Sequence, residues 1–228
     1  MTEREYQAVF FDIGGVIVEL ASIRAGYASF IDELAVEYGL DSDEALEEWK
    51  TTLGNHFRER KGTEYRLARD GYAKATASLF DGEPPANWHE RLESAVTDAL
   101  RPESGIVETV SALSSTELQL AVVSDIDTPE AHSMLGTLGI REYFDHFTTS
   151  EAVGYTKPDE RMFRDALDAL DVDPMRTIMI GDRYEHDIVG AADAGIETVA
   201  YGEDARGSRA DHEIDQLEEL LVIVGKSE

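Results

Sequence analysis

Five short apolar runs, separated by segments with helical periodicity, constrain the fold of this chain more than any other feature. Each run contains β-branched or aromatic residues and is bounded by polar residues or glycine, as expected for buried strands. The expected strands are residues 7–12, 118–125, 146–150, 177–182 and 197–202, and the expected helices after the second to fifth of them are 128–138, 159–170, 187–194 and 215–224. Strands joined by helices predict an α/β fold with a doubly wound parallel sheet.

The segment between the first and second strands differs from the rest of the chain. It has helical periodicity from about residue 21 to 99 and almost no strand pattern, with a loop at 81–87 (DGEPPAN) between helices. We therefore expect an inserted helical domain at 18–98 and an α/β core domain formed by 1–17 and 99–228. A chain of 228 residues is long enough for both.

Two stretches outside these elements carry weaker expectations. The aromatic residues of 139–147 (GIREYFDHF) are expected to pack behind the third strand. The acidic, glycine-bearing stretch 202–215 is expected to be a solvated, mobile loop.

Charge and composition exclude several classes of function. Forty-eight acidic residues against 20 basic ones give a formal net charge of −28, which would repel nucleic acid and anionic membranes. The absence of cysteine excludes disulfides and thiolate chemistry. There is no apolar run of about 20 residues that could span a bilayer, and the N-terminus lacks a signal pattern, so a cytoplasmic location is expected.

The excess of acidic residues has two explanations, a surface adapted to very high salt or an unusually acidic mesophilic surface. We favour the first because molar salt reduces the Debye length to about 3 Å and so removes most self-repulsion. This halophilic interpretation predicts that dialysis into low salt lowers the melting temperature substantially.

Polar residues gather where the expected strands end. Asp12 ends the first strand, Ser124 and Asp125 end the second, Asp182 ends the fourth, and Lys157 lies just beyond the third. An aspartate at a strand end is usually a helix cap or turn former. Because ligands of parallel sheets bind at the carboxyl ends of strands, four polar strand ends together favour a functional site.

This set of side chains predicts a metal-assisted phosphoryl-transfer site. Carboxylates on neighbouring strands, such as Asp12 and Asp182, repel each other unless a cation lies between them, and Mg²⁺ prefers such oxygen ligands. Lys157 and Ser124 can hold phosphate oxygens. The amides of 13–15 (Ile-Gly-Gly) can do the same. A carboxylate can also act as a covalent nucleophile and form an aspartyl-phosphate.

Four motifs, in order, resemble those of the haloacid dehalogenase-like (HAD) hydrolase superfamily: FFDIGGVIV, VVSDID, GYTKPDERMF and IMIGDRYEHDIVGAADAG. The last, with Gly181, Asp182 and Asp187, is the most specific. The resemblance covers the N-terminal strand and roughly residues 100–205. It implies a Mg²⁺-dependent phosphatase for a small phosphorylated metabolite, and it identifies the insertion with the helical (C1-type) cap of that superfamily.

The resemblance also implies individual roles. Asp12 would be the nucleophile, and Ser124 and Lys157 would bind the transferring phosphoryl group. The implied metal ligands are Asp12, the backbone carbonyl of Gly14, Asp182 and Asp187. We also assign Gly14, Gly15, Asp125 and Arg66 to substrate binding.

Arg66 belongs to a dense basic patch in the helical insertion, FRERKGTEYRLAR, whose cations are Arg58, Arg60, Lys61, Arg66 and Arg69. The patch is either a solvated helix face that pairs with neighbouring acids or a surface that recognises a second phosphate or carboxylate of the substrate. If the second is right, substitution of Arg66 raises KM without changing kcat.

Residue 14 departs from the pattern that the resemblance implies. Phosphatases of the superfamily usually carry a second aspartate two residues after the nucleophile, which protonates the leaving group and then activates water. Here that residue is Gly14. Loss of a general acid–base typically costs about 10²–10⁴-fold in rate.

Three hypotheses accommodate Gly14. The first is a phosphatase that tolerates the loss or uses another group, with Glu19, Asp127 and His186 as candidates. The second is a 2-haloacid dehalogenase-type enzyme, in which the nucleophile attacks carbon and no leaving group needs a proton. The third is a binding protein with little turnover. A requirement for Mg²⁺ distinguishes the first from the second.

Overall fold

The computed structural model describes residues 5–225 of the chain and contains a parallel sheet of six strands. The strands are β1 (Ala8–Phe11), β2 (Gln119–Ser124), β3 (His146–Thr149), β4 (Thr177–Gly181), β5 (Glu197–Tyr201) and β6 (His212–Ile214). Their order across the sheet is β3-β2-β1-β4-β5-β6, and every neighbouring pair is parallel. The expected α/β fold with a doubly wound parallel sheet is therefore confirmed.

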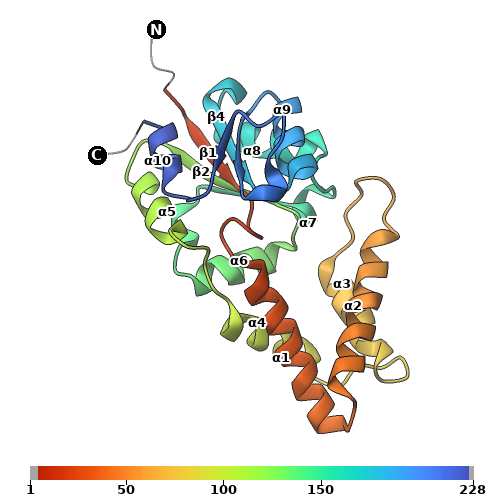
Figure 1. The fold of residues 1–228 in the computed structure, drawn as a ribbon. Helices are drawn as coiled ribbons and strands as arrows, with labels where there is room; N and C mark the ends of the chain where they lie inside the picture. Colours follow the sequence, from red (N-terminus) through yellow and green to blue (C-terminus); the bar gives the residue numbers. More distant parts are fainter. Residues whose placement is uncertain (1–4, 226–228) are drawn as a thin grey trace.

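Helices cover both faces of this sheet (Figure 1). They are α5 (Ile106–Ser114), α6 (Thr128–Thr137), α7 (Ser150–Val153), α8 (Glu160–Leu170), α9 (Gly190–Asp193) and α10 (Glu219–Ile223). Alternate strand residues enter two cores: Val9 and Phe11 pack with α5, α6 and α10, whereas Ala8 and Phe10 pack with α8 and α9. Because both faces are covered, the central strands β1 and β4 are buried along their whole length and show no alternation of apolar and polar residues.

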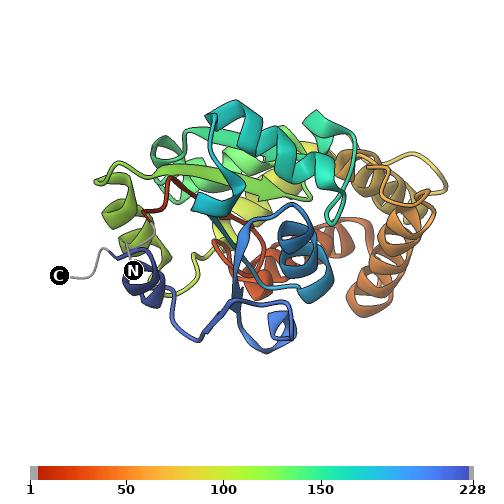
Figure 2. The same ribbon diagram turned by 90° about the horizontal axis from the view of Figure 1, so that it is seen from above.

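Four helices lie between β1 and α5, and we call them the four-helix segment: α1 (Leu20–Tyr38), α2 (Ser42–Arg58), α3 (Ala68–Ser78) and α4 (Trp88–Ala99). Helix α1 packs along α4, and α2 packs along α3. Figures 1 and 2 place α2 and α3 on the side of the molecule away from α10. Three aromatic rings, Tyr27, Trp49 and Tyr72, join α1, α2 and α3, with centroids 5.1–5.9 Å apart. The division of the chain into domains at 18–98 stays a prediction.

The expectation that 202–215 is a mobile loop was wrong. The stretch contains β6, which extends the sheet beyond β5, and its Ile214 is buried. Asp211 fixes the approach of this strand, because its carboxylate accepts hydrogen bonds from the backbone amide and the hydroxyl of Thr198. A three-residue strand with one inward apolar side chain has too weak a pattern to be predicted from sequence.

The two C-terminal helices also differ from expectation. The helix expected at 187–194 begins earlier, as a π-helical turn at Tyr184–Val189 that continues into α9. The widened turn brings the Asp187 carboxylate back to the amide of Arg183, 2.9 Å away. Such turns often occur at functional sites. Helix α10 begins at Glu219 rather than at residue 215, after a turn.

The connections of the sheet determine where a ligand can bind. From β1 the strand order runs outward in both directions, through β2 to β3 on one side and through β4 to β6 on the other. The carboxyl ends of β1 and β4 therefore flank the switch point, which is where parallel sheets bind ligands. None of the helices within residues 5–225 combines the length and apolar character that crossing a membrane requires.

Candidate active site

Three aspartates meet at the switch point of the sheet. Asp12 directly follows β1, Asp182 directly follows β4, and Asp187 lies on the π-helical turn after it. One carboxylate oxygen of each lies within 4.8 Å of the other two. The structure thus brings together the acidic side chains that the sequence predicted to meet.

Two glycines permit this close approach. Gly15 has a φ of 78°, and a Cβ at this position would collide with the carboxylate of Asp182. A Cβ at Gly181 would collide with the side chain of Asp187. The backbone can therefore surround the acidic cluster only because both residues lack a side chain.

Lys157 is the cation of this cluster. Its side chain is fully buried, and its Nζ lies 2.9 Å from Oδ1 of Asp12 and 2.6 Å from Oδ1 of Asp187. It also donates a hydrogen bond of 2.8 Å to the carbonyl of Val123 in β2. Burial alone would lower the pKa of Lys157, but Asp12 and Asp187 raise it above its ordinary value. The ammonium is therefore held charged beside Asp12.

The residues of the cluster fit a divalent cation. Lys157 supplies one buried positive charge for three carboxylates. Burial, and then the charges of Asp12 and Asp187, raise the pKa of Asp182 to about 7. Oδ1 of Asp182 is buried and has no hydrogen-bond partner within residues 5–225. Several carboxylate oxygens, one of them without a donor, are the ligand set that Mg²⁺ prefers.

The cluster opens into a cavity of about 290 Å³, which we call the active-site cavity. Ser124 lines it from the end of β2, as expected for a group that contacts a ligand. The loop after β1 offers fewer amides than expected, because Gly15 donates to the carbonyl of Val18 and Ile13 donates to Oδ1 of its neighbour Asp12. Within the described part of the chain, the amide of Gly14 donates to no protein group.

Asp125 also lines the cavity, but its oxygens are occupied by the protein. Oδ1 accepts hydrogen bonds from the amide of Lys157 (2.7 Å) and from Ser150 (3.2 Å). Oδ2 lies 3.1 Å from Nη2 of Arg183 and 3.2 Å from Nδ1 of His186. Burial alone would raise the pKa of Asp125, but His186, Lys157 and Arg183 hold it below its ordinary range. These contacts favour a positioning role over direct substrate binding, which stays a prediction.

An apolar side chain lies next to the position that the side chain of an aspartate at residue 14 would occupy. A Cβ at Gly14 would be 3.0 Å from Cδ2 of Leu20, the first residue of α1. None of the three candidates for a replacement acid, Glu19, Asp127 and His186, occupies this position. Asp127 accepts hydrogen bonds from Tyr65, Ala68 and Arg69; His186 contacts Asp125; and Glu19 is not among the residues that line the active-site cavity.

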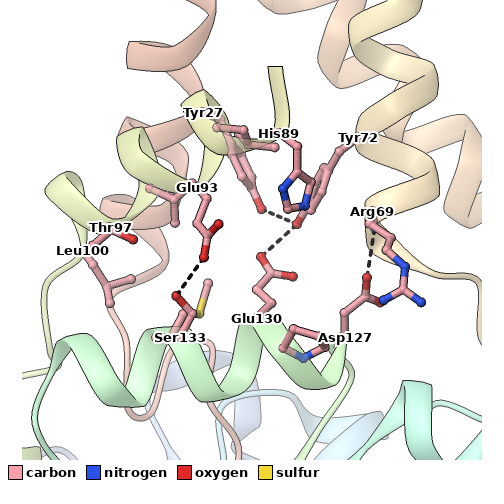
Figure 3. A pocket seen from close by; sticks show the side chains of 14 residues that line it. Tyr27, Arg69, Tyr72, His89, Glu93, Thr97, Leu100, Asp127, Glu130 and Ser133 are labelled. Atoms are coloured by element: carbon pink, nitrogen blue, oxygen red, sulfur yellow. Dashed lines mark hydrogen bonds between the residues drawn. The ribbon is translucent and has the colours of Figure 1, made fainter. Parts of the chain in front are cut away.

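A second cavity, of about 280 Å³, lies between α6 and the four-helix segment, and we call it the side cavity (Figure 3). It shares Tyr27, Tyr72, Glu130 and Met134 with the active-site cavity. Sequence analysis did not identify Glu130 or the two tyrosines. Their spacing along the chain carries no motif, and an acid in the first turn of a helix usually only complements the helix dipole.

The basic patch of the insertion is largely paired with its own neighbours. Arg66 lies 3.0 Å from Glu59, Arg69 lies 2.7 Å from Glu151, and Arg58 donates to Asn55. Arg66 is not among the residues lining either cavity. The structure thus supports the ion-pairing alternative for Arg66, and anion recognition by this residue stays a prediction.

The structure combines a doubly wound parallel sheet with an acidic cluster at the strand ends, and comparison with known proteins identifies the family. Residues 6–195 match the family of haloacid dehalogenase-like hydrolases. The chain therefore belongs to this family, as its motifs predicted.

Similar proteins align over nearly their whole length. The chain is 31% identical to ribulose-1,5-bisphosphate 5-phosphatase of Halopiger xanaduensis, covering 95% of this chain and 98% of that protein. It is 28% identical to glyceraldehyde 3-phosphate phosphatase of Methanothermobacter thermautotrophicus, covering 94% and 99%. The crystal structure of a HAD phosphatase from Thermococcus onnurineus superposes with a TM-score of 0.76 at 25% identity, covering 97% of this chain and 99% of that one.

Proposed function

We propose that this protein hydrolyses a small phosphorylated metabolite with Asp12 as the nucleophile. The observation that carries the proposal is the position of Asp12, buried at the end of β1, 2.9 Å from a charged lysine and within the acidic cluster. Relatives that align over nearly their full length and are named as phosphatases support the same activity.

Hydrolysis of the phosphate ester would proceed in two steps. In the first, a carboxylate oxygen of Asp12 attacks phosphorus, the bond to the leaving oxygen breaks, and that oxygen takes up a proton. In the second, water attacks phosphorus, the bond to Asp12 breaks, and inorganic phosphate leaves. Lys157 and Ser124 stabilise the charge on the phosphoryl oxygens during both steps.

A bound Mg²⁺ would be held by Asp12, Asp182, Asp187 and the carbonyl of Gly14, and would neutralise charge on the transferring group. Leu20 lies beside Gly14, and within residues 5–225 we find no carboxylic acid at the usual position for protonating the leaving group. Substrates whose leaving group needs no proton, such as acyl phosphates, should therefore react faster than alkyl phosphates.

The test is a panel of phosphate esters and acetyl phosphate, assayed with and without Mg²⁺ at high salt, with Asp12→Asn as the control. We expect turnover that requires Mg²⁺ and falls by about 10⁴-fold or more in Asp12→Asn. Turnover that survives the substitution would overturn the role of Asp12.

The same assay, extended to 2-haloacids, distinguishes the two alternative functions, a dehalogenase-type enzyme and a binding protein. Gly14 and its apolar neighbour are equally compatible with displacement of halide from carbon, which needs no proton for the leaving group. Halide release from 2-haloacids without metal would establish that chemistry in place of phosphatase activity. Failure on both substrate classes would instead indicate a binding role.

We further infer a cytoplasmic setting and a surface adapted to high salt. The net charge of −28 supports the second inference, because only concentrated salt screens so much like charge. Thermal melts at low and molar KCl test it, and a melting temperature independent of salt would contradict it.

A further inference from the structure

The side cavity gives the active site a second compartment with a different character. Its wall is mainly apolar. Leu92 and Val96 of α4, Leu100 directly after α4, and Met134 of α6 form this apolar part. It meets the active-site cavity at Tyr27, Tyr72, Glu130 and Met134. A substrate with its phosphate at Asp12 and its other end in the side cavity would contact these shared residues.

The shared polar residues form a hydrogen-bonded chain. The hydroxyls of Tyr27 and Tyr72 are 2.8 Å apart, and Tyr72 donates to Oε1 of Glu130 over 3.1 Å. Figure 3 shows the two tyrosines pointing down from the four-helix segment toward Glu130, which rises from α6. Burial raises the pKa of Glu130 to about 7, so the carboxyl group is mostly protonated below neutral pH.

Cations around the two cavities are already paired. Arg69 is the one arginine lining the side cavity within the described chain, and it lies 2.7 Å from Glu151. Arg183 lines the active-site cavity and lies 3.1 Å from Asp125. Besides Arg69, Glu130 and the two tyrosines, the charged or titratable residues that line the side cavity are His89, which is exposed, and two acids, Glu93 and Asp127. A second phosphate there would meet carboxylates and no unpaired arginine or lysine.

We propose that the side cavity holds the uncharged, hydroxylated part of a singly phosphorylated substrate, and that Tyr72 and Glu130 determine specificity by hydrogen bonding to its hydroxyl groups. The proposal rests on the phosphatase function proposed above. It commits to a monophosphate of a neutral polyol or sugar and excludes a bisphosphate as the preferred substrate.

The experiment compares ribulose 5-phosphate with ribulose 1,5-bisphosphate, two substrates that share one carbon skeleton and differ in the phosphate at carbon 1. Acetyl phosphate serves as a substrate too small to reach the side cavity. We expect kcat/KM for the monophosphate to exceed that for the bisphosphate by at least about tenfold, the effect of roughly 1.4 kcal/mol. Equal or better turnover of the bisphosphate would overturn the proposal.

Two variants test the named residues, and a third is their control. Tyr72→Phe should raise KM for ribulose 5-phosphate about two- to tenfold, the range for one neutral hydrogen bond, and should raise KM for acetyl phosphate by a smaller factor. In the wild type, KM for ribulose 5-phosphate should rise above pH 7, because Glu130 then ionises beside the substrate. Glu130→Gln stays neutral and should remove that rise. Glu93 also lines the cavity but is exposed, so Glu93→Gln should retain the rise of KM above pH 7.

Calorimetry of ribulose 5-phosphate and ribulose 1,5-bisphosphate binding to Asp12→Asn tests the side-cavity proposal independently of the phosphatase function. If acetyl phosphate is not hydrolysed, the proposed function fails, while the ratio of the two dissociation constants still tests specificity. Tighter binding of the monophosphate supports the side-cavity proposal. A ratio near one, or one that Tyr72→Phe and Glu130→Gln leave unchanged, overturns it.

Discussion

The acidic cluster at the strand ends, with its Lys157, and the side cavity are neighbouring regions that differ in how their polar groups are held in place. In the cluster, Asp12, Lys157 and Asp187 are buried and joined by ion pairs of 2.6–2.9 Å. In the side cavity, Tyr72 and Glu130 come from different parts of the fold and share one hydrogen bond of 3.1 Å. The sheet thus fixes the groups to which we assign the reaction, whereas the groups that we propose to contact the rest of the substrate depend on how the four-helix segment packs against α6.

One carboxylate joins the helices on the two sides of the side cavity. Asp127, at the start of α6, accepts hydrogen bonds from the hydroxyl of Tyr65 and from the amides of Ala68 and Arg69 at the start of α3. A carboxylate at a helix N-terminus satisfies amides that have no partner within the helix. Asp127 therefore holds the four-helix segment against α6, directly beside the side cavity.

The largest effect is expected in the cluster. Lys157→Met leaves the buried carboxylates of Asp12 and Asp187 without their cation, so the free energy of unfolding should fall by about 3–5 kcal/mol in metal-free protein. Arg161→Met is the matched control, because it removes an exposed partner of Asp159 and should change stability little. Urea denaturation measures both. Equal losses would show that burial of the pair does not matter.

The next prediction concerns Gly14, which lines the active-site cavity. The double variant Gly14→Asp, Leu20→Ala supplies an acid and removes the side chain that a Cβ would meet. It should accelerate hydrolysis of alkyl phosphates by about tenfold or more, part of the 10²–10⁴-fold that a general acid provides. Acetyl phosphate, whose leaving group needs no acid, should show no gain. A gain on both substrates would contradict this explanation.

A smaller effect is expected on the pH dependence of stability at the side cavity. The folded-state pKa of Glu130 is raised to about 7, above its unfolded value of about 4.3. The folded state therefore binds more protons between these values, and the free energy of unfolding should fall as pH rises through that range. Denaturation curves at pH 5 and pH 8 should show this loss for the wild type relative to Glu130→Gln. Parallel pH profiles would refute the raised pKa.

The smallest effect is expected at Arg66, outside both regions. Its guanidinium pairs with Glu59 and is absent from the lining of either cavity, so Arg66→Ala should leave kcat and KM unchanged. Steady-state kinetics on the best substrate of the panel would decide this. A raised KM with constant kcat would instead assign Arg66 to anion recognition.

Much of the strand-end site followed from local sequence patterns. Buried strands have a strong signal, and a polar residue at the end of each parallel strand must reach one edge of the sheet. The sequence therefore predicted that Asp12, Ser124, Lys157 and Asp182 would meet. The π-helical turn at Asp187 and the short strand β6 escaped prediction, because both depend on side chains that hydrogen-bond to backbone outside any periodic pattern.

The side cavity could not be predicted in the same way. Tyr27, Tyr72 and Glu130 are far apart in the chain, and each fits an ordinary amphipathic helix. From the sequence alone came the α/β fold, the family, the strand-end position of Asp12 and the absence of an acid at residue 14. Only the tertiary placement of α1 and α3 beside α6 decided which side chains line the side cavity, because contacts between helices depend on the three-dimensional arrangement of surfaces that no local pattern encodes.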